Sequence, residues 1–225
     1  MQINEKTKAD LCLIENDWMM TGGERMALIG ILKMFEPASV LEFGCRFGGA
    51  TKWMSELSHE VVTVDIDSNC EKYISHLDNV RFLNMTTQEA ASLLRKEEKK
   101  FDMVFVDADH TYAGVYKDLL DAFQLGDIIL FHDAYMTACR KGAKKALKNT
   151  NYFYDLDFVP GYLQANGLWG GLGIVIPKFT RKEKYIADPR FPVHGLLRLI
   201  SIFRNPVDIF SNTMLAKKIK RLIRL

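Results

Sequence analysis

Five polar residues that can bind metals or move protons follow directly after two apolar runs of the sequence. The runs are residues 101–106 and 126–131, each long enough for one buried strand. The polar residues are Asp107, Asp109 and His110 after the first run, and His132 and Asp133 after the second. Because ligands of open parallel sheets lie beyond the carboxyl ends of the strands, we expect all five in one crevice. Carboxylates can hold divalent cations there, and a histidine titrates near neutral pH and can accept a proton.

A glycine-rich turn follows an earlier apolar run and is the second candidate site. Residues 40–49 read Val-Leu-Glu-Phe-Gly-Cys-Arg-Phe-Gly-Gly, which is typical of a strand that ends in a tight turn before a helix. Glycine lets the backbone approach a ligand closely because it has no Cβ atom. The turn lacks the Lys-Ser/Thr pair of a P-loop, and its glycine spacing does not match G-x-G-x-x-G. Phosphate binding is therefore disfavoured, and an ordinary strand-to-helix turn stays open as an alternative.

An acidic residue ends the next apolar run, residues 60–65. Asp65 lies 23 residues after Glu42, close to the offset of about 20 residues at which an acid binds ribose hydroxyls in nucleotide-binding folds. An ionised carboxylate would accept both hydroxyls in short, charge-assisted hydrogen bonds. We assign this role to Asp65, and we expect Asp67 to cap the helix that follows.

Strands and helices alternate along the chain, which predicts an α/β fold with a mostly parallel sheet. Apolar runs predict strands at 40–43, 60–65, 80–84, 101–106, 126–131, 152–159 and 172–176. Helical spacing is found at 10–20, 24–35, 50–57, 70–77, 115–125 and 137–149, and another helix opens at 85–88. Residues 160–171 are rich in glycine and aromatic residues, which fits either a lid that binds an acceptor or a long hairpin connection.

The pattern Glu42-x-Gly44-x-x-x-Gly48 resembles the first motif of class I S-adenosylmethionine-dependent methyltransferases. The segments Val-Asp-Ala-Asp-His at 106–110 and Phe-His-Asp at 131–133 resemble the metal cluster of the metal-dependent O-methyltransferases that act on catechols, sugars and antibiotics. The resemblance covers about residues 24–177. It implies a Rossmann-like class I methyltransferase fold, with a seven-stranded, mostly parallel sheet, an antiparallel closing strand and helices on both faces. It also implies O-methylation of a hydroxyl on a small molecule or sugar.

The resemblance assigns roles residue by residue. The residues expected to bind S-adenosylmethionine are Glu42, Gly44, Cys45, Gly48, Asp65, Ile66, Thr87, Gln88 and Asp107. The expected ligands of a divalent metal, Mg or Mn, are Asp107, His132 and Asp133, and the expected catalytic residues are His110 and Asp109. His110 takes the place of the lysine base of catechol O-methyltransferase.

Several of these roles have structural alternatives. The family has a carboxylate at the position of His132, and magnesium prefers oxygen ligands, so this histidine favours manganese, iron, zinc or no metal. Without a metal, His132 and Asp133 would form a hydrogen-bonded pair that closes a turn. Thr87 and Gln88 also fit the signature of a helix start.

The composition is that of a soluble globular protein. The chain has 225 residues, of which 48% are hydrophobic and 26% charged, and no apolar run approaches the roughly 20 residues of a membrane span. The polar first ten residues do not resemble a secretory signal, which predicts a cytoplasmic location. Four cysteines without a C-x-x-C pair argue against a zinc site and against a disulfide framework.

Charge and proline spacing predict three regions. Residues 1–37 are expected to be lead-in helices, residues 38–177 the S-adenosylmethionine-binding catalytic domain, and residues 178–225 a basic amphipathic extension. The extension has 12 Lys or Arg against three acidic residues. Such a segment is typical of membrane-surface or partner contacts, so we expect peripheral membrane association or a homo-oligomer contact there. Basic residues without interleaved aromatic residues do not predict nucleic-acid binding.

Two further functions compete with methyl transfer. A ligand-binding module without catalysis is disfavoured by the intact Asp109-His110 pair, and a nicotinamide-dependent oxidoreductase is disfavoured by the missing G-x-G-x-x-G motif.

Overall fold

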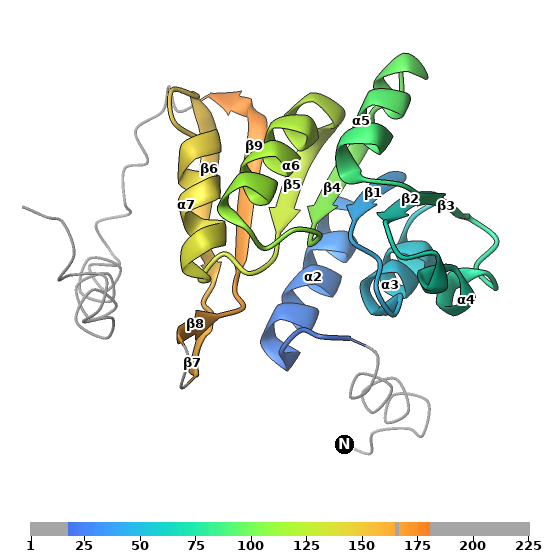
Figure 1. Ribbon diagram of the computed structural model, residues 1–225, viewed down its shortest axis with the longest axis horizontal. Helices are drawn as coiled ribbons and strands as arrows, with labels where there is room; N and C mark the ends of the chain where they lie inside the picture. The colour runs from blue at the N-terminus through green and yellow to red at the C-terminus, as the bar shows by residue number, and fades with distance from the viewer. Residues whose placement is uncertain (1–17, 165–166, 181–225) are drawn as a thin grey trace, which may run out of the picture. The chain divides into compact units, whose positions relative to one another are not determined.

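A computed structural model describes residues 18–164 and 167–180 of the chain, and Figure 1 labels their helices and strands. The helices are α2 (Gly22–Phe35), α3 (Gly49–Leu57), η1 (Ser68–Cys70), α4 (Glu71–Ile74), α5 (Thr87–Lys96), α6 (Tyr112–Leu125) and α7 (Thr137–Ala146). The strands are β1 (Ser39–Phe43), β2 (Glu60–Asp65), β3 (Val80–Asn84), β4 (Phe101–Val106), β5 (Gly126–Phe131), β6 (Tyr152–Val159), β7 (Tyr162–Gln164), β8 (Gly167–Trp169) and β9 (Leu172–Thr180).

Seven of the strands form one sheet in the order β3-β2-β1-β4-β5-β9-β6. The strands β1 to β5 pair in parallel, and β9 runs antiparallel between β5 and β6. This arrangement confirms the predicted mostly parallel sheet with an antiparallel closing strand. The order reverses at β1 and β4, whose carboxyl ends therefore border the crevice in which such sheets bind ligands.

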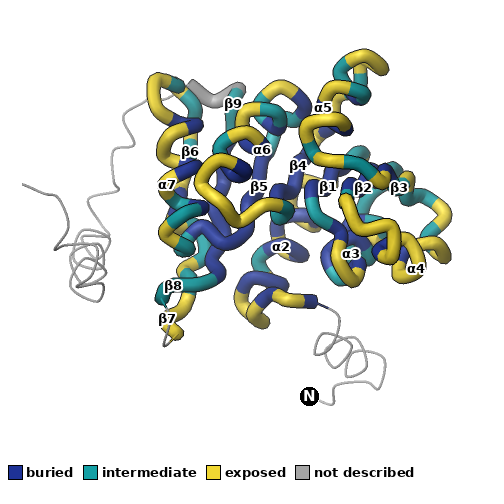
Figure 2. Tube along the Cα trace, viewed as in Figure 1, coloured by how far each residue is buried: buried dark blue, intermediate teal, exposed yellow. Residues whose placement is uncertain are grey.

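Helices cover both faces of the sheet, as predicted, because successive strand residues point to opposite sides. Leu41 and Phe43 of β1 are buried on the face that packs against α5, α6 and α7. Val40 of the same strand is buried with α2 and α3 on the other face. In Figure 2 the central strands are accordingly dark blue, while the outer sides of the helices are yellow.

Local signals determine where the site-bearing helices begin. Thr21 caps α2 in a capping box with Glu24, and Thr86 caps α5 in the same way with Glu89. The Thr111 hydroxyl caps α6 by accepting a hydrogen bond from the Gly114 N–H. Each cap supplies partners for N–H groups that the helix itself leaves without an acceptor.

The structure differs from the sequence-based prediction at several boundaries. Residues 18–20 are not helical, and the rest of the helix predicted at 10–20 lies outside the described residues. Residues 160–171 connect the antiparallel strands β6 and β9, which agrees with the hairpin alternative, and they contain the small hairpin of β7 and β8; β9 continues past residue 177 to Thr180. The predictions for the basic extension beyond residue 180 lie outside the described residues. In the part of the chain that the structure describes, no helix is both long and apolar enough to cross a membrane.

Gly44 allows β1 and β4 to place their ends side by side. Its φ angle is +96°, and a Cβ atom there would collide with the main-chain carbonyl of Asp107. We therefore expect Gly44→Ala to lower the free energy of unfolding by about 2–4 kcal/mol, through backbone strain and overpacking. Urea denaturation measures this change.

Gly30 of α2 provides the matched control. Nothing lies within 4 Å of a Cβ atom built on Gly30, so Gly30→Ala should raise the free energy of unfolding by about 0.5–1 kcal/mol. A Gly44→Ala variant as stable as the unmodified protein would contradict the close-approach argument.

Candidate functional site

The glycine turn after β1 is hydrogen-bonded to Asp65, the acid at the end of β2. One carboxylate oxygen of Asp65 accepts hydrogen bonds from the backbone N–H groups of Cys45 and Arg46, both at 3.0 Å. The other oxygen accepts one from the N–H of Asp67 at 2.9 Å. Asp67 in turn caps the next turn of helix through Asn69, as predicted. Asp65 therefore shapes the turn, and its role toward a ribose stays a prediction.

Glu42 is a completely buried acid under the same turn. Its Oε2 accepts hydrogen bonds from the hydroxyls of Thr51 at 2.5 Å and Thr63 at 2.6 Å. Its Oε1 has no hydrogen-bond partner among the described residues, although the side chain borders the pocket. Burial raises the pKa of Glu42 to about 7, and the nearby carboxylates of Asp107 and Asp65 add to the increase. This carboxyl group is therefore suited to a cationic ligand, which would restore its charge.

The first turn of α5, which follows β3, is fixed by a buried aspartate of α6. Asp118 Oδ1 accepts hydrogen bonds from the Thr87 hydroxyl at 2.6 Å and from the Gln88 side-chain amide at 2.8 Å. Burial raises the pKa of Asp118 to about 6. Because the amide nitrogen of Gln88 donates to Asp118, its carbonyl oxygen is left for another donor.

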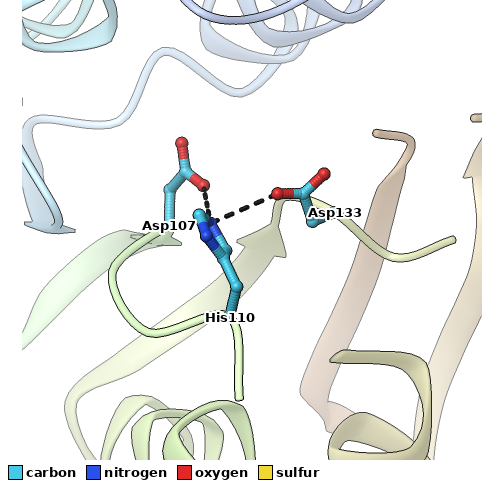
Figure 3. A group of neighbouring side chains, drawn as sticks. All are labelled: Asp107, His110 and Asp133. Carbon is cyan, nitrogen blue, oxygen red and sulfur yellow. Dashed lines mark hydrogen bonds and ion pairs between the residues drawn. The ribbon is translucent and has the colours of Figure 1, made fainter. Parts of the chain in front are cut away.

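Three of the polar residues after β4 and β5 form a compact cluster. His110 Nε2 lies 3.2 Å from Asp107 Oδ1 and 3.2 Å from Asp133 Oδ2. Figure 3 shows the imidazole between the two carboxylates. The hydrogen bond and the charge of Asp107, with the charge of Asp133, raise the pKa of His110. Ligand atoms of all three residues lie within 4.8 Å of one another, so they could hold a metal ion.

His132 belongs to a buried layer behind this cluster. Its Nδ1 lies 3.1 Å from Asp107 Oδ1, and its Nε2 lies 3.5 Å from Glu24 Oε2 of α2. Burial opposes a charge on His132, but the carboxylates of Asp107, Glu24 and Asp133 raise its pKa well above the ordinary value. Both ring nitrogens face carboxylates, so the cluster that could hold a metal contains His110 in place of the predicted His132. The metal role of His132 stays a prediction.

The two acids that face His132 are correspondingly ionised. Burial alone would raise the pKa of Asp107, but the charge of His132 and the hydrogen bond with His110 lower it to about 2. Burial would likewise raise the pKa of Glu24, but His132 and the backbone N–H groups of Gly171 and Thr21 lower it to about 2. The layer thus alternates positive and negative side chains.

Asp109, predicted to be catalytic, is engaged in the helix start. One of its oxygens accepts a hydrogen bond from the Thr111 N–H at 2.8 Å, and the other accepts one from the Thr111 hydroxyl at 3.1 Å. Its carboxylate also packs closely against Gly114, where a Cβ atom would collide with it. The geometry therefore supports a role in positioning the loop that carries His110.

One pocket of about 750 Å³ joins these groups. It is bordered by the predicted residues Glu42, Gly44, Cys45, Asp65, Ile66, Thr87, Gln88, Asp107, Asp109, His110, His132 and Asp133. Gly48 does not border it and instead packs against Ile74. The pocket also has an apolar wall that comprises Trp18, Met19 and Met20 before α2 and Tyr162 and Trp169 of the hairpin.

Sequence reasoning missed Glu24, whereas a lid that binds an acceptor was one of the two alternatives for residues 160–171, which include Tyr162 and Trp169. The signal Thr-x-x-Glu at 21–24 predicts a capping box, but it does not reveal that the glutamate also reaches the site. Trp18, Met19 and Met20 lie in a short apolar stretch that suits helix packing equally well.

Comparisons with known proteins agree with this architecture. Residues 41–134 match the family model described as a methyltransferase domain. The fold is similar to an O-methyltransferase from Bacillus cereus solved with SAH, with a TM-score of 0.59 and 15% identity over 75% of this chain and 87% of that one. It is also similar to the O-methyltransferase TomG from Streptomyces achromogenes, solved with SAM, with a TM-score of 0.59 and 14% identity over 76% and 86% of the two chains. A search of curated protein sequences found no match.

The two kinds of comparison support different statements. The solved structures are below 25% identity and establish the fold, whereas the family match covers β1 to the end of β5 and includes both the glycine turn and the cluster. The fold is therefore that of the class I methyltransferases, and residues 41–134, less than half of the chain, resemble a methyltransferase domain.

Proposed function

We propose that this enzyme transfers the methyl group of S-adenosylmethionine to a hydroxyl oxygen of a small molecule or sugar, with His110 as the general base. The observation that carries the proposal is the position of His110. Its Nε2 lies between the carboxylates of Asp107 and Asp133, which keep a proton on that nitrogen, so Nδ1 is the nitrogen that accepts a proton in the pocket that the glycine turn also borders. The β4 end is tied directly to that turn, because the Asp107 N–H donates to the Phe43 carbonyl at 2.7 Å. Proton acceptor and methyl-donor site therefore share one cavity.

The pocket offers suitable partners for each part of S-adenosylmethionine. Glu42 and the glycine turn would hold the cationic methionine end, Asp65 the ribose hydroxyls, and Thr87 with Gln88 the adenine. The carbonyl oxygen of Gln88 is left to accept a hydrogen bond from an exocyclic amine, because its amide nitrogen donates to Asp118. The solved O-methyltransferases with SAH or SAM bound support this cofactor.

The apolar wall suggests what kind of acceptor enters. Its aromatic residues Trp18, Tyr162 and Trp169 could pack against the flat face of a phenol or the apolar face of a sugar ring. A hydroxyl on such a ring would reach His110, which is 42% exposed. We therefore expect a small cyclic hydroxyl compound as the partner of this pocket, and not a nucleic acid.

The reaction follows from this placement. The acceptor oxygen forms a bond to the methyl carbon as the carbon–sulfur bond breaks. The electron pair of the broken carbon–sulfur bond stays on sulfur, which gives S-adenosylhomocysteine. His110 takes the hydroxyl proton during the attack. Fixed orientation of acceptor and methyl donor supplies much of the rate.

The cluster of Asp107, His110 and Asp133 could instead bind a divalent metal. The donor set fits, since Asp107 and Asp133 offer oxygen ligands and His110 a nitrogen ligand within a short distance of one another. Bound there, a metal would stabilise negative charge on the acceptor oxygen. A neutral His110 that binds a metal through Nε2 carries its proton on Nδ1 and cannot accept another one there, so the proton role proposed here predicts transfer that survives treatment with EDTA.

Calorimetry with S-adenosylmethionine and with NAD tests the proposal. We expect saturable binding of S-adenosylmethionine and no binding of NAD. Binding of NAD alone would favour the oxidoreductase. Binding of S-adenosylmethionine without release of S-adenosylhomocysteine, across a panel of phenols and sugars, would favour the ligand-binding module.

Asp118 gives a separate prediction for the adenine end. Asp118→Ala removes the acceptor that fixes Thr87 and Gln88, so affinity for S-adenosylmethionine should fall about tenfold, which corresponds to roughly 1.4 kcal/mol. Asp121 lies on the same helix as Asp118, and Asp121→Ala breaks an ion pair with Arg95 of α5. This control should leave that affinity unchanged. Equal affinities in the two variants, measured by calorimetry, would remove Asp118 from the cofactor site.

A further inference from the structure

Two helices among the described residues, α2 and α5, start with the same capping box, but their glutamates differ in what else they contact. Glu89 of α5 is exposed and contacts Thr86 alone among the described residues. Glu24 of α2 makes the equivalent bonds to Thr21, at 2.6 Å to the N–H and 2.8 Å to the hydroxyl, but is only 1% exposed. A cap does not require burial of its carboxylate, so the burial of Glu24 must result from other contacts.

The other contacts of Glu24 come from the hairpin and from the site. Glu24 Oε1 accepts a hydrogen bond from the N–H of Gly171, and Oε2 lies 3.5 Å from His132 Nε2. The neighbouring N–H of Gly170 donates to Asp133 Oδ1 at 2.8 Å. Two successive amides at the base of the hairpin are thus bound by two carboxylates that also contact the histidines of the site.

The Gly170–Gly171 turn determines where the hairpin wall lies. Both glycines have positive φ angles, +66° and +83°. A Cβ atom on Gly170 would collide with Glu24 Oε1 and with the ring of Tyr162. Gly170 therefore packs against both the Glu24 carboxylate and the Tyr162 ring, with no room for a side chain of its own.

The next residue of α2, Arg25, anchors the other part of the apolar wall, which contains Trp18 and Met20. The buried guanidinium of Arg25 donates to the carbonyls of Met20 at 2.7 Å and Trp18 at 2.6 Å. It also lies 5.6 Å from the centre of the Trp18 ring, within cation–π range. Adjacent residues in the first turn of α2 thus anchor both halves of the apolar wall.

From these contacts we infer that Glu24 is a positioning residue for the methyl acceptor: it joins the Gly170–Gly171 turn to His132 and so sets the hairpin wall against the Asp107, His110 and Asp133 cluster. The inference rests on the proposed function, which places the acceptor between this wall and His110. Arg25 does the same for the wall of Trp18 and Met20. The first turn of α2 therefore connects acceptor binding to the proton-accepting cluster.

Hydrogen exchange separates this role from simple helix capping. Glu24→Gln retains a residue suited to a capping box but loses the charge, and an amide cannot accept hydrogen bonds at both of its ends. We expect exchange in a peptide covering residues 167–173 to become at least tenfold faster. Glu24→Asp keeps the charge but shortens the reach, so it should accelerate the same peptide and serves as the second variant where Glu24→Gln does not fold.

Two controls report the cap alone. Thr21→Ala removes the cap hydroxyl, one of the two Thr21 donors to Glu24 Oε2, and leaves the Thr21 N–H donor and the Gly171 contact in place. Glu89→Gln changes the matching capping box of α5. Both should leave exchange at 167–173 within twofold of the unmodified protein. Equal exchange in the Glu24 variants and these controls would overturn the positioning role.

Calorimetry with S-adenosylmethionine on the same samples keeps the two proposals apart. Glu24 does not border the pocket, so cofactor affinity should stay within threefold in the Glu24 variants while exchange of the hairpin base rises. Loss of cofactor affinity to the same extent as the change in exchange would indicate a general structural role and would overturn the inference. Failure of the unmodified protein to bind S-adenosylmethionine would instead refute the proposed function.

Discussion

Replacing His110 with asparagine should lower the rate of methyl transfer by about 10²–10⁴-fold, the usual contribution of a general base. Asparagine can keep a hydrogen bond to Asp107 but cannot take up a proton at neutral pH. The affinity for S-adenosylmethionine should stay within twofold, because His110 contacts Asp107 and Asp133 at the acceptor side of the pocket. Release of S-adenosylhomocysteine in the presence of a phenol or sugar acceptor measures the rate, and calorimetry measures the affinity.

The pH dependence gives an independent check of the same residue. Only the neutral imidazole can accept a proton, and the carboxylates of Asp107 and Asp133 raise the pKa of His110. The rate of the unmodified enzyme should therefore rise with pH and level off above the ordinary histidine value of about 6.5. His76→Asn, at an exposed position after α4, should keep both the rate and the pH profile. A fully active His110→Asn variant would exclude the base assignment.

The sheet could be predicted from the sequence because parallel strands are buried on both faces. The run Val61-Val62-Thr63-Val64 is almost continuously apolar, which predicts a strand in the centre of a sheet. The order of such strands then places their carboxyl ends together, which is why Asp107, His132 and Asp133 could be assigned to one crevice. Burial and topology carried this part of the prediction.

The contribution of α2 could not be predicted in the same way. The apolar spacing of residues 24–35 predicts a helix and its buried stripe, but it does not say which turn of the helix lies over the site. The contact of Glu24 with Gly171 spans 147 residues of sequence, and no local pattern records such a distance. For the same reason the sequence does not show that His132 Nε2 faces Glu24, and the metal role of His132 stays a prediction.

Individual roles within the cluster were also beyond local patterns. A carboxylate next to a histidine suits a metal, a proton transfer or a helix cap equally well, and only distances separate these roles. Asp109 illustrates the point, since both of its oxygens are bound to Thr111. His110, one residue later, lies instead between two carboxylates.

Glu42→Gln should make the protein more stable at high pH and a weaker cofactor binder. The pKa of Glu42 is about 7 in the folded protein against an ordinary 4.5. Between these values the unfolded chain loses a proton that the folded protein retains, so stability falls as pH rises through this window. The cost at pH 8 is roughly 3 kcal/mol. Glutamine does not ionise, so the variant should gain up to that amount at pH 8 and nothing below pH 4.5.

The same substitution removes the negative charge that Glu42 can offer to a cationic ligand in the pocket. Affinity for S-adenosylmethionine should fall at least tenfold at pH 8, and the pH dependence of binding between 6 and 8 should disappear, because in the unmodified protein Glu42 must ionise to bind the cation. Urea denaturation at pH 5 and 8 and calorimetry measure the two effects. Glu56→Gln, at an exposed position of α3, should change neither. A Glu42→Gln variant that is less stable at pH 8 yet binds the cofactor normally would show that this carboxyl group supports the fold and does not serve the cofactor.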